Sequence, residues 1–193
     1  MTQAPALVLI STSFPISGDG SEAAGSFVSD LVEEISKYVP VRVVAPGAAN
    51  ARERWSSNVE VFRYATPARP LSTLKPWVPS QLAEILRVLR NGANATDDAL
   101  AAGSTAHLLA MWALPSGHWA RNAAKRTGVP YSVWTLGSDI WTLGKIPLLR
   151  SYMGRVLRDA EICYSDGIKL AEDTRRIAAR EVRFLPSTRR ISR

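Results

Sequence analysis

The fold follows from a short apolar run near the N-terminus, Ala6-Leu7-Val8-Leu9-Ile10-Ser11. The run is continuous and β-prone, as expected of a parallel strand that is buried on both faces. Apolar residues then recur at three- and four-residue spacing over residues 27–35, which predicts a helix that Ser21 or Ser26 caps. A second β-prone run follows at residues 41–45. These segments predict a βαβ unit with a right-handed crossover.

The alternation of strands and helices continues to the end of the chain. Later strands are predicted at residues 59–64, 106–112, 131–135, 160–164 and 182–185, and helices at residues 82–91, between Gly117 and about Arg126, at 148–158 and at 168–179. Four prolines between residues 65 and 79 predict a surface loop. This order predicts an α/β fold, a doubly wound parallel sheet of the Rossmann-like type, in one unit over residues 1–193.

The amino-acid composition limits the classes of protein to which the chain can belong. With 193 residues, of which 46% are hydrophobic and 21% charged, the chain is expected to build one sizeable soluble core. The longest apolar runs are too short to span a bilayer and lack the flanks of a signal peptide, so a cytoplasmic location is expected. Cys163 is the single cysteine, which excludes an intramolecular disulfide and a cysteine-rich zinc site. With two histidines, no metal site is predicted.

The formal net charge is +7, and basic residues crowd the last third of the chain. Such a surface attracts phosphates, nucleic acid or anionic lipid, although a solvated helix face explains it equally well. No nucleic-acid motif or aromatic stacking platform accompanies the charge, so no nucleic-acid partner is expected. The basic residues concerned are Arg150, Arg155, Arg158, Arg175, Arg176, Arg180, Arg183, Arg189, Arg190 and Arg193.

Polar loops follow three of the predicted strands, at the edge where parallel sheets bind their ligands. The first loop covers residues 13–26 and contains Gly18, Gly20 and Gly25. Glycines allow the backbone to approach a ligand closely, and the N-terminus of the following helix favours an anion such as phosphate. The pattern is neither GxGxxG nor a Walker A loop, and a flexible connection is the alternative interpretation.

The second and third loops each carry a candidate polar group. In the second, residues 112–118, Ser116 either caps the following helix or faces a ligand, and His118 is either a surface residue or part of the site. In the third, residues 136–141, Asp139 binds sugar hydroxyls, acts in proton transfer, or caps the next segment.

The ordered set of loops resembles the N-terminal domain of family 4 GT-B glycosyltransferases, over essentially the whole chain. The resemblance is carried by Phe14-Pro15 with the glycine loop to Gly25-Ser26-Phe27-Val28, Trp112-Ala113-Leu114-Pro115-Ser116-Gly117, Val129-Pro130-Tyr131, Leu136-Gly137-Ser138-Asp139-Ile140 and Ala160-Glu161-Ile162-Cys163-Tyr164-Ser165. It implies a retaining transferase that moves a sugar from a nucleotide-sugar donor to an acceptor glycan or lipid, without a metal or another cofactor. Two Rossmann-like halves would face a cleft.

The resemblance also assigns roles to individual residues. Asp139 would be the catalytic residue, beside the transferred sugar or the acceptor. The glycine loop would face the donor diphosphate. The implied donor- and acceptor-binding residues are Gly18, Gly20, Gly25, Ser26, Ser116, Gly117, His118, Gly137 and Ser138.

The chain departs from the family pattern in two ways. Leu136 and Met111 stand where the family often has a histidine, and apolar side chains donate no hydrogen bond there. Residues 1–193 are expected to form the acceptor-side domain without the donor-binding C-terminal half, and to be inactive alone.

A different class of function remains open. A non-catalytic module would bind a glycan, a lipid acceptor or an anionic membrane, which would place it on the inner face of the membrane. Its surface would comprise Trp77, residues 82–90, Lys145 and residues 150–158, although ordinary helix packing explains these residues as well.

Overall fold

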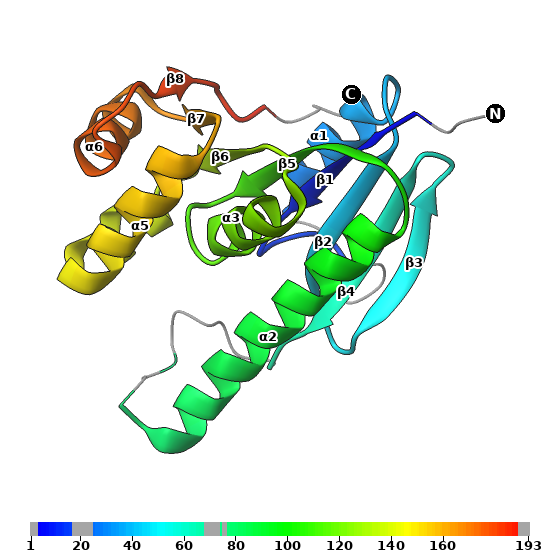
Figure 1. The fold of residues 1–193 in the computed structure, drawn as a ribbon, viewed down its shortest axis with the longest axis horizontal. Helices are drawn as coiled ribbons and strands as arrows, with labels where there is room; N and C mark the ends of the chain where they lie inside the picture. Colours follow the sequence, from blue (N-terminus) through cyan, green and yellow to red (C-terminus); the bar gives the residue numbers. More distant parts are fainter. Residues whose placement is uncertain (1–3, 17–24, 68–73, 75–76, 189–193) are drawn as a thin grey trace.

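The computed structural model describes residues 4–16, 25–67, 74 and 77–188. Eight strands form one sheet in the order β3-β4-β2-β1-β5-β6-β7-β8 (Figure 1). The strands are β1 (Ala6–Ile10), β2 (Val41–Gly47), β3 (Ala51–Ser56), β4 (Val59–Ala65), β5 (Thr105–Met111), β6 (Tyr131–Thr135), β7 (Ile162–Ser165) and β8 (Arg183–Phe184). The helices are α1 (Ser26–Ile35), α2 (Pro79–Ala101), α3 (Ser116–Thr127), α4 (Ser138–Trp141), a 3₁₀ turn (Leu143–Lys145), α5 (Pro147–Asp159) and α6 (Ile168–Ala178).

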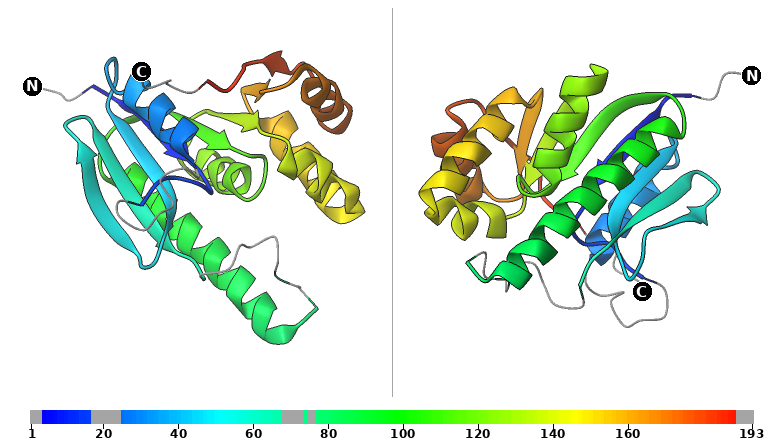
Figure 2. Two further views of the ribbon diagram at one scale, coloured as in Figure 1. Left: turned by 180° about the vertical axis from the view of Figure 1, so that it is seen from behind. Right: turned by 60° about the horizontal axis from the view of Figure 1, so that its bottom comes forward.

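Helices cover both faces of the sheet, which confirms the doubly wound α/β prediction (Figure 2). On one face, Val28 and Val32 of α1 pack in a cluster with alternate residues of the central strands, including Val43. On the opposite face, α2, α3, α5 and α6 pack against the other alternate set, which includes Val44. Because both faces are covered, β1 and β2 are apolar along almost their whole length.

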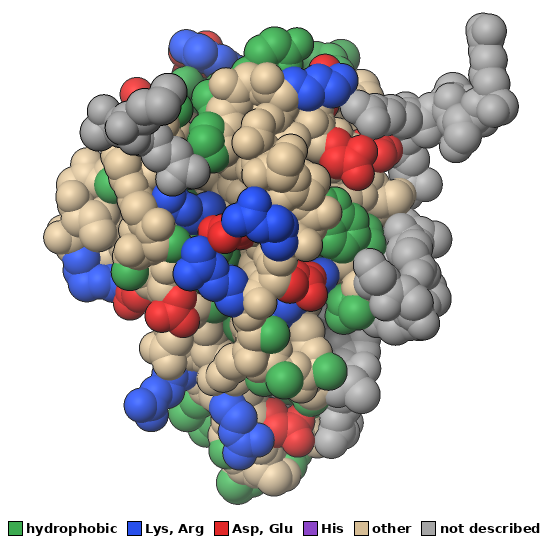
Figure 3. Space-filling view, turned by 90° about the vertical axis from the view of Figure 1, so that its right-hand side faces the viewer, with side chains coloured by type: hydrophobic (Ala, Val, Ile, Leu, Met, Phe, Trp, Pro, Cys, Tyr) green, Lys and Arg blue, Asp and Glu red, His purple; other side chains and the backbone are tan. Residues whose placement is uncertain are grey.

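β3 was not expected from the sequence and is the one antiparallel strand among the described residues. It forms the edge of the sheet, and its residues 51–54 are exposed. Arg52 pairs with Glu60 of β4 at 2.9 Å. Figure 3, which views the molecule from this side, shows basic and acidic side chains next to one another. A charged edge strand lacks the apolar pattern by which strands are detected, and its charges discourage pairing with another chain.

α2 is longer than predicted, because Asn91 and Gly92 lie inside the helix and do not end it. Gly92 is buried, and a Cβ atom built there would lie 2.2 Å from Cζ2 of Trp119 in α3. The Trp119 indole N–H donates to the Leu89 carbonyl at 2.9 Å, one turn earlier in α2. Gly92 is therefore the contact point of two helices.

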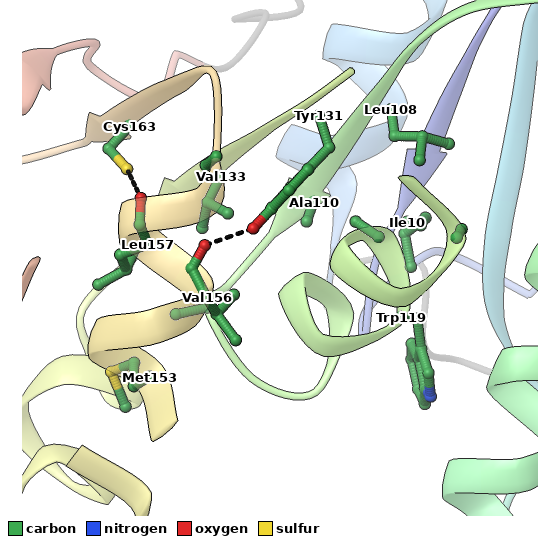
Figure 4. Close-up of a cluster of buried hydrophobic side chains, with 14 of the residues drawn as sticks. Ile10, Leu108, Ala110, Trp119, Tyr131, Val133, Met153, Val156, Leu157 and Cys163 are labelled. Carbon is green, nitrogen blue, oxygen red and sulfur yellow. Dashed lines mark hydrogen bonds between the residues drawn. The ribbon is translucent and has the colours of Figure 1, made fainter. Parts of the chain in front are cut away.

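Two polar side chains in the core beside α5 are paired with backbone carbonyls of that helix (Figure 4). The Tyr131 hydroxyl donates to the Val156 carbonyl at 2.5 Å, and Cys163 Sγ donates to the Leu157 carbonyl at 3.2 Å. Burial raises the pKa of the Cys163 thiol to about 11, so this side chain is protonated at neutral pH.

Substitution of Gly92 by alanine tests the contact between α2 and α3. Alanine improves helix propensity by about 1 kcal/mol, but its methyl group would overlap the Trp119 ring. We expect Gly92→Ala to lower the free energy of unfolding by about 1–3 kcal/mol in urea denaturation. The exposed Asn94→Ala in the same helix should change it by less than about 0.5 kcal/mol. Equal stability of the two variants would contradict this packing.

Candidate functional site

The structure brings the loops after β1, β5 and β6 together at the carboxyl edge of three adjacent strands. The ring of Phe27, at the start of α1, lies 6.3 Å from the ring of Trp112 after β5. The next residue, Ala113, donates its backbone N–H to Oδ2 of Asp139 at 2.6 Å. A continuous chain of contacts therefore joins the beginning of α1 to the loop after β6.

The start of α1 is formed by a glycine and not by a serine cap. Gly25 is the N-cap residue, with φ 96°, so the prediction that Ser26 caps the helix is wrong. A Cβ atom at Gly25 would lie 2.6 Å from Oγ of Ser13, and therefore only glycine fits this left-handed turn. Ser21, Gly18 and Gly20 lie outside the described residues.

Ser116 is the first residue of α3 and is fully buried, and it makes no capping hydrogen bond. The cap interpretation of Ser116 is therefore wrong. Its Oγ has no hydrogen-bond partner within the described part of the chain. A Cβ atom at the neighbouring Gly117 would lie 2.8 Å from Cγ1 of Val156, so this glycine allows α3 to approach α5. A buried, unsatisfied hydroxyl is unusual and marks Ser116 as a candidate for contact with a ligand or water.

His118 points toward α5. Its Nδ1 hydrogen-bonds to the Tyr152 hydroxyl, and its Nε2 lies 3.2 Å from Nδ2 of Asn122. The ring is half-buried. Desolvation, with a smaller effect of the Arg121 charge, lowers the pKa of His118. Both ring nitrogens are engaged by protein groups, and this histidine stabilises the packing of α3 on α5.

Asp139 is the most unusual polar residue of the edge. It is 2% exposed and is the second residue of α4, whose N-cap is Gly137, so the interpretation of Asp139 as a cap is wrong. While Oδ2 accepts from Ala113, Oδ1 has no hydrogen-bond partner among the described residues. Desolvation raises the pKa of the Asp139 carboxyl, and backbone N–H groups oppose the shift. One oxygen therefore positions the loop after β5, and the other is buried without a hydrogen-bond partner among the described residues.

The turn before Asp139 depends on Gly137. This residue has φ 110°, and a Cβ atom there would lie 3.1 Å from Cζ3 of Trp141. Ser138 is exposed at the beginning of α4. Of the predicted residues in this loop, Ser138 is therefore accessible to a substrate, Asp139 is buried beneath the turn, and Gly137 makes the turn possible.

Trp112 was missed as a residue of interest in the sequence. It has φ 71°, a left-handed conformation that is uncommon for a large side chain. Its N–H donates to the Trp134 carbonyl of β6 at 2.8 Å, and its own carbonyl accepts from Gly117 at 3.2 Å. Strained backbone of this kind is retained where the surrounding contacts fix it, and it is enriched at functional sites. Sequence patterns carry no signal for a left-handed tryptophan.

Met111 and Leu136 occupy the two positions at which the resembling family often has histidine. Met111 is fully buried in the core on the α1 side of the sheet, and Leu136 packs against the same cluster. The core therefore accounts for the apolar character of both positions.

Two substitutions of Asp139 separate its hydrogen bond from its charge. Asp139→Ala leaves the buried Ala113 N–H without its acceptor and should lower the free energy of unfolding by about 1–3 kcal/mol. Asp139→Asn retains an acceptor oxygen and removes a poorly solvated charge, so its stability at pH 7 should equal or exceed that of the wild type. Urea denaturation measures both, and an alanine variant as stable as the wild type would rule out the structural role.

The pH dependence of stability tests the environment of His118. In the folded state the pKa of His118 lies below its usual value of 6.5. As pH falls below 6.5, the unfolded chain therefore binds a proton at this side chain before the folded chain does. The free energy of unfolding should therefore decrease as pH falls through and below 6.5. His118→Asn should reduce this dependence, and His107, whose pKa is also lowered, should account for a remaining part. An unchanged pH profile in the variant would refute the assignment.

Comparisons with known proteins identify the fold. No model of a protein family and no curated protein matches the chain. The structure is similar to an α,α-trehalose-phosphate synthase (UDP-forming) from Burkholderia vietnamiensis, with a TM-score of 0.60, 14% identity, and coverage of 93% of this chain and 43% of that one. It is also similar to the α,α-trehalose 6-phosphate synthase from Burkholderia multivorans, with a TM-score of 0.55 and 15% identity. That match covers 90% of this chain and 42% of the other.

A third solved structure, Phytolacca americana UGT2 complexed with UDP-2-fluoro-glucose and pterostilbene, has a TM-score of 0.50 and 12% identity, and the match covers 96% of this chain and 54% of that one. The chain thus spans about half the length of the proteins that it resembles. These neighbours are GT-B glycosyltransferases, and the chain has the fold of one Rossmann-like half of such a protein.

Proposed function

We propose that the chain is the N-terminal, acceptor-side half of a retaining family 4 glycosyltransferase. Together with a second Rossmann-like half, it transfers a sugar from a nucleotide-activated donor to an acceptor glycan or lipid. The similarity to GT-B enzymes over 93% of the chain supports glycosyl transfer as the class of reaction. The ordered loop motifs of residues 14–28, 112–117 and 136–140 support family 4.

One observation carries the proposal: Asp139 is a buried carboxylate with one unpartnered oxygen among the described residues, at the carboxyl edge of the sheet. Sugars are bound through their hydroxyl groups, for which a carboxylate oxygen is a strong acceptor. Because β1 and β5 are adjacent while their crossovers run in opposite directions, this edge is the switch point at which α/β sheets bind ligands.

The chemistry of the reaction matches the groups at the edge. As the bond between sugar and diphosphate breaks, the leaving diphosphate gains negative charge, which oriented N–H groups and positive dipoles stabilise. The N-terminus of α1 after Gly25 provides such groups. Asp139 hydrogen-bonds a hydroxyl of the transferred sugar or of the acceptor and orients it. Its burial favours this positioning role over proton exchange with solvent.

The proposal requires a second half. In the neighbours, the region that this chain matches is 42–54% of the whole protein. The chain by itself provides one wall of a cleft, without a complete site for the nucleotide. A role as a non-catalytic binding module is the alternative, and it predicts that no partner half confers turnover.

The experiment measures nucleoside diphosphate release from a panel of nucleotide sugars. We expect little turnover by the chain alone and robust turnover when a polypeptide containing the second Rossmann-like half is present. In that complex, Asp139→Asn should reduce kcat/KM about 10- to 100-fold, as expected for loss of a hydrogen bond to a charged group. Full activity of the chain alone would contradict the proposal that it needs a second half. Inactivity of the complex with every donor would exclude glycosyl transfer.

A further inference from the structure

Large apolar side chains are exposed on two helical segments at the carboxyl edge of the sheet. The first group, which we call the α2 tip, comprises Trp77, Leu82 and Leu86 at the start of α2, and Trp77 is 76% exposed. The second, the α5 tip, comprises Trp141, Ile146 and Leu148 around the start of α5, and Leu148 is 84% exposed. Singly exposed apolar residues are common, but grouped ones with tryptophan mark an interaction surface.

The two tips lie on the same side of the molecule. Figures 1 and 2 show that the N-terminal ends of α2 and α5 both project beyond the carboxyl edge of the sheet. Both helices cover the same face of the sheet, whereas α1 covers the other. A surface that contacts both tips therefore meets the molecule on the α2 and α5 side. The turn at Gly25, which precedes α1, lies toward the opposite face.

The charge around the tips is mostly positive, although Glu84 lies between Leu82 and Leu86 and Asp173 accepts a hydrogen bond from the Trp141 indole at 3.1 Å. Residues 140–158 contain four basic residues and no Asp or Glu. Four exposed cations in the first half of α2 and around the start of α5 form no ion pair with any residue that the structure describes: Arg87, Arg90, Lys145 and Arg150.

Several cations elsewhere on the surface are paired, although the exposed Arg158 and Arg175 form no ion pair with a residue that the structure describes. Arg52 lies 2.9 Å from Glu60, and Arg121 lies 2.6 Å from Asp159. On the β3 side, basic and acidic side chains are intermixed (Figure 3). Unpaired cations are therefore grouped near the tips, but they are not confined to them.

We propose that the α2 tip and the α5 tip together dock the chain on the surface of an anionic membrane. Tryptophan and leucine side chains enter the headgroup region, while neighbouring lysines and arginines face the negative charge of the lipids. No helix in the described ranges combines the length and apolarity needed to cross a bilayer, so the contact is with the surface. This docking goes beyond the proposed glycosyl transfer, and lipid binding is measured without a sugar substrate.

Co-sedimentation of the full chain with vesicles tests the proposal. We expect binding to mixed phosphatidylcholine–phosphatidylglycerol vesicles that weakens as salt is raised, and much weaker binding to pure phosphatidylcholine. Each cation near an anionic surface contributes roughly fivefold to the partition coefficient. Lys145→Gln with Arg150→Gln should therefore reduce binding about 25-fold. As a control with the same net charge, Arg54→Gln with Arg126→Gln should leave most of the binding intact.

The apolar contribution is tested separately. Trp77→Ser and Leu148→Ser should each reduce binding at least about tenfold, since each removes a large side chain from the interface. Tyr38→Ser is the matched control, because Tyr38 is 80% exposed at the end of α1, away from both tips. Circular dichroism establishes that every variant is folded.

Three results would overturn the proposal. The first is that the chain binds neutral and anionic vesicles equally well. The second is that the tip variants and their controls change vesicle binding to the same extent. The third is that the chain forms a dimer and that the tip variants abolish dimer formation. The last result would assign the tips to a second copy of the chain. If vesicle binding is absent and sugar is still transferred, only the docking proposal fails. If vesicles are bound and no sugar is transferred, only the proposed function fails.

Discussion

The parallel pairing of β1 with β5 is the constraint on which the rest of the structure depends. Leu7 pairs with His107 and Ile10 with Ala110, although about 100 residues separate the two strands. From β1 the chain first builds β2, β3 and β4 on one side and then crosses through α2 to build β5 to β8 on the other. The reversal leaves the loops after β1 and β5 side by side, and the candidate site exists because of it.

Buried polar contacts then hold these loops in place. Arg63 of β4 donates to the carbonyls of Pro15 at 2.7 Å and Pro46 at 3.1 Å, and thereby fixes the segment after β1. Asp139 performs the same task for the segment after β5 through Ala113. Because both side chains are nearly inaccessible to water, their hydrogen bonds are poorly replaced by solvent, and the edge is organised before any ligand binds.

Sequence patterns predicted the fold where one physical rule dominated. The strand at residues 6–10 was identified correctly, because a strand buried on both faces reads as a continuous apolar run. The strand Tyr131–Thr135 was also identified correctly, from its β-branched and aromatic residues. β3 was missed, since a charged edge strand has no such pattern. Gly92 was misread as a helix end. A glycine is required there because the Trp119 ring packs against it, and this contact joins residues that are distant in the sequence. Ser116 was placed at the correct edge, but its burial depends on packing that no local motif encodes.

Amide chemical shifts of the ¹⁵N-labelled chain, recorded during titration with nucleotide sugars to millimolar concentration, test the central claim that this edge is a sugar-transfer cleft. The account predicts that the perturbed amides cluster at Gly25, Ala113 and Gly137. Perturbations confined to the opposite edge, around Gly103 and Gly128, or an unperturbed carboxyl edge with every donor, would contradict it.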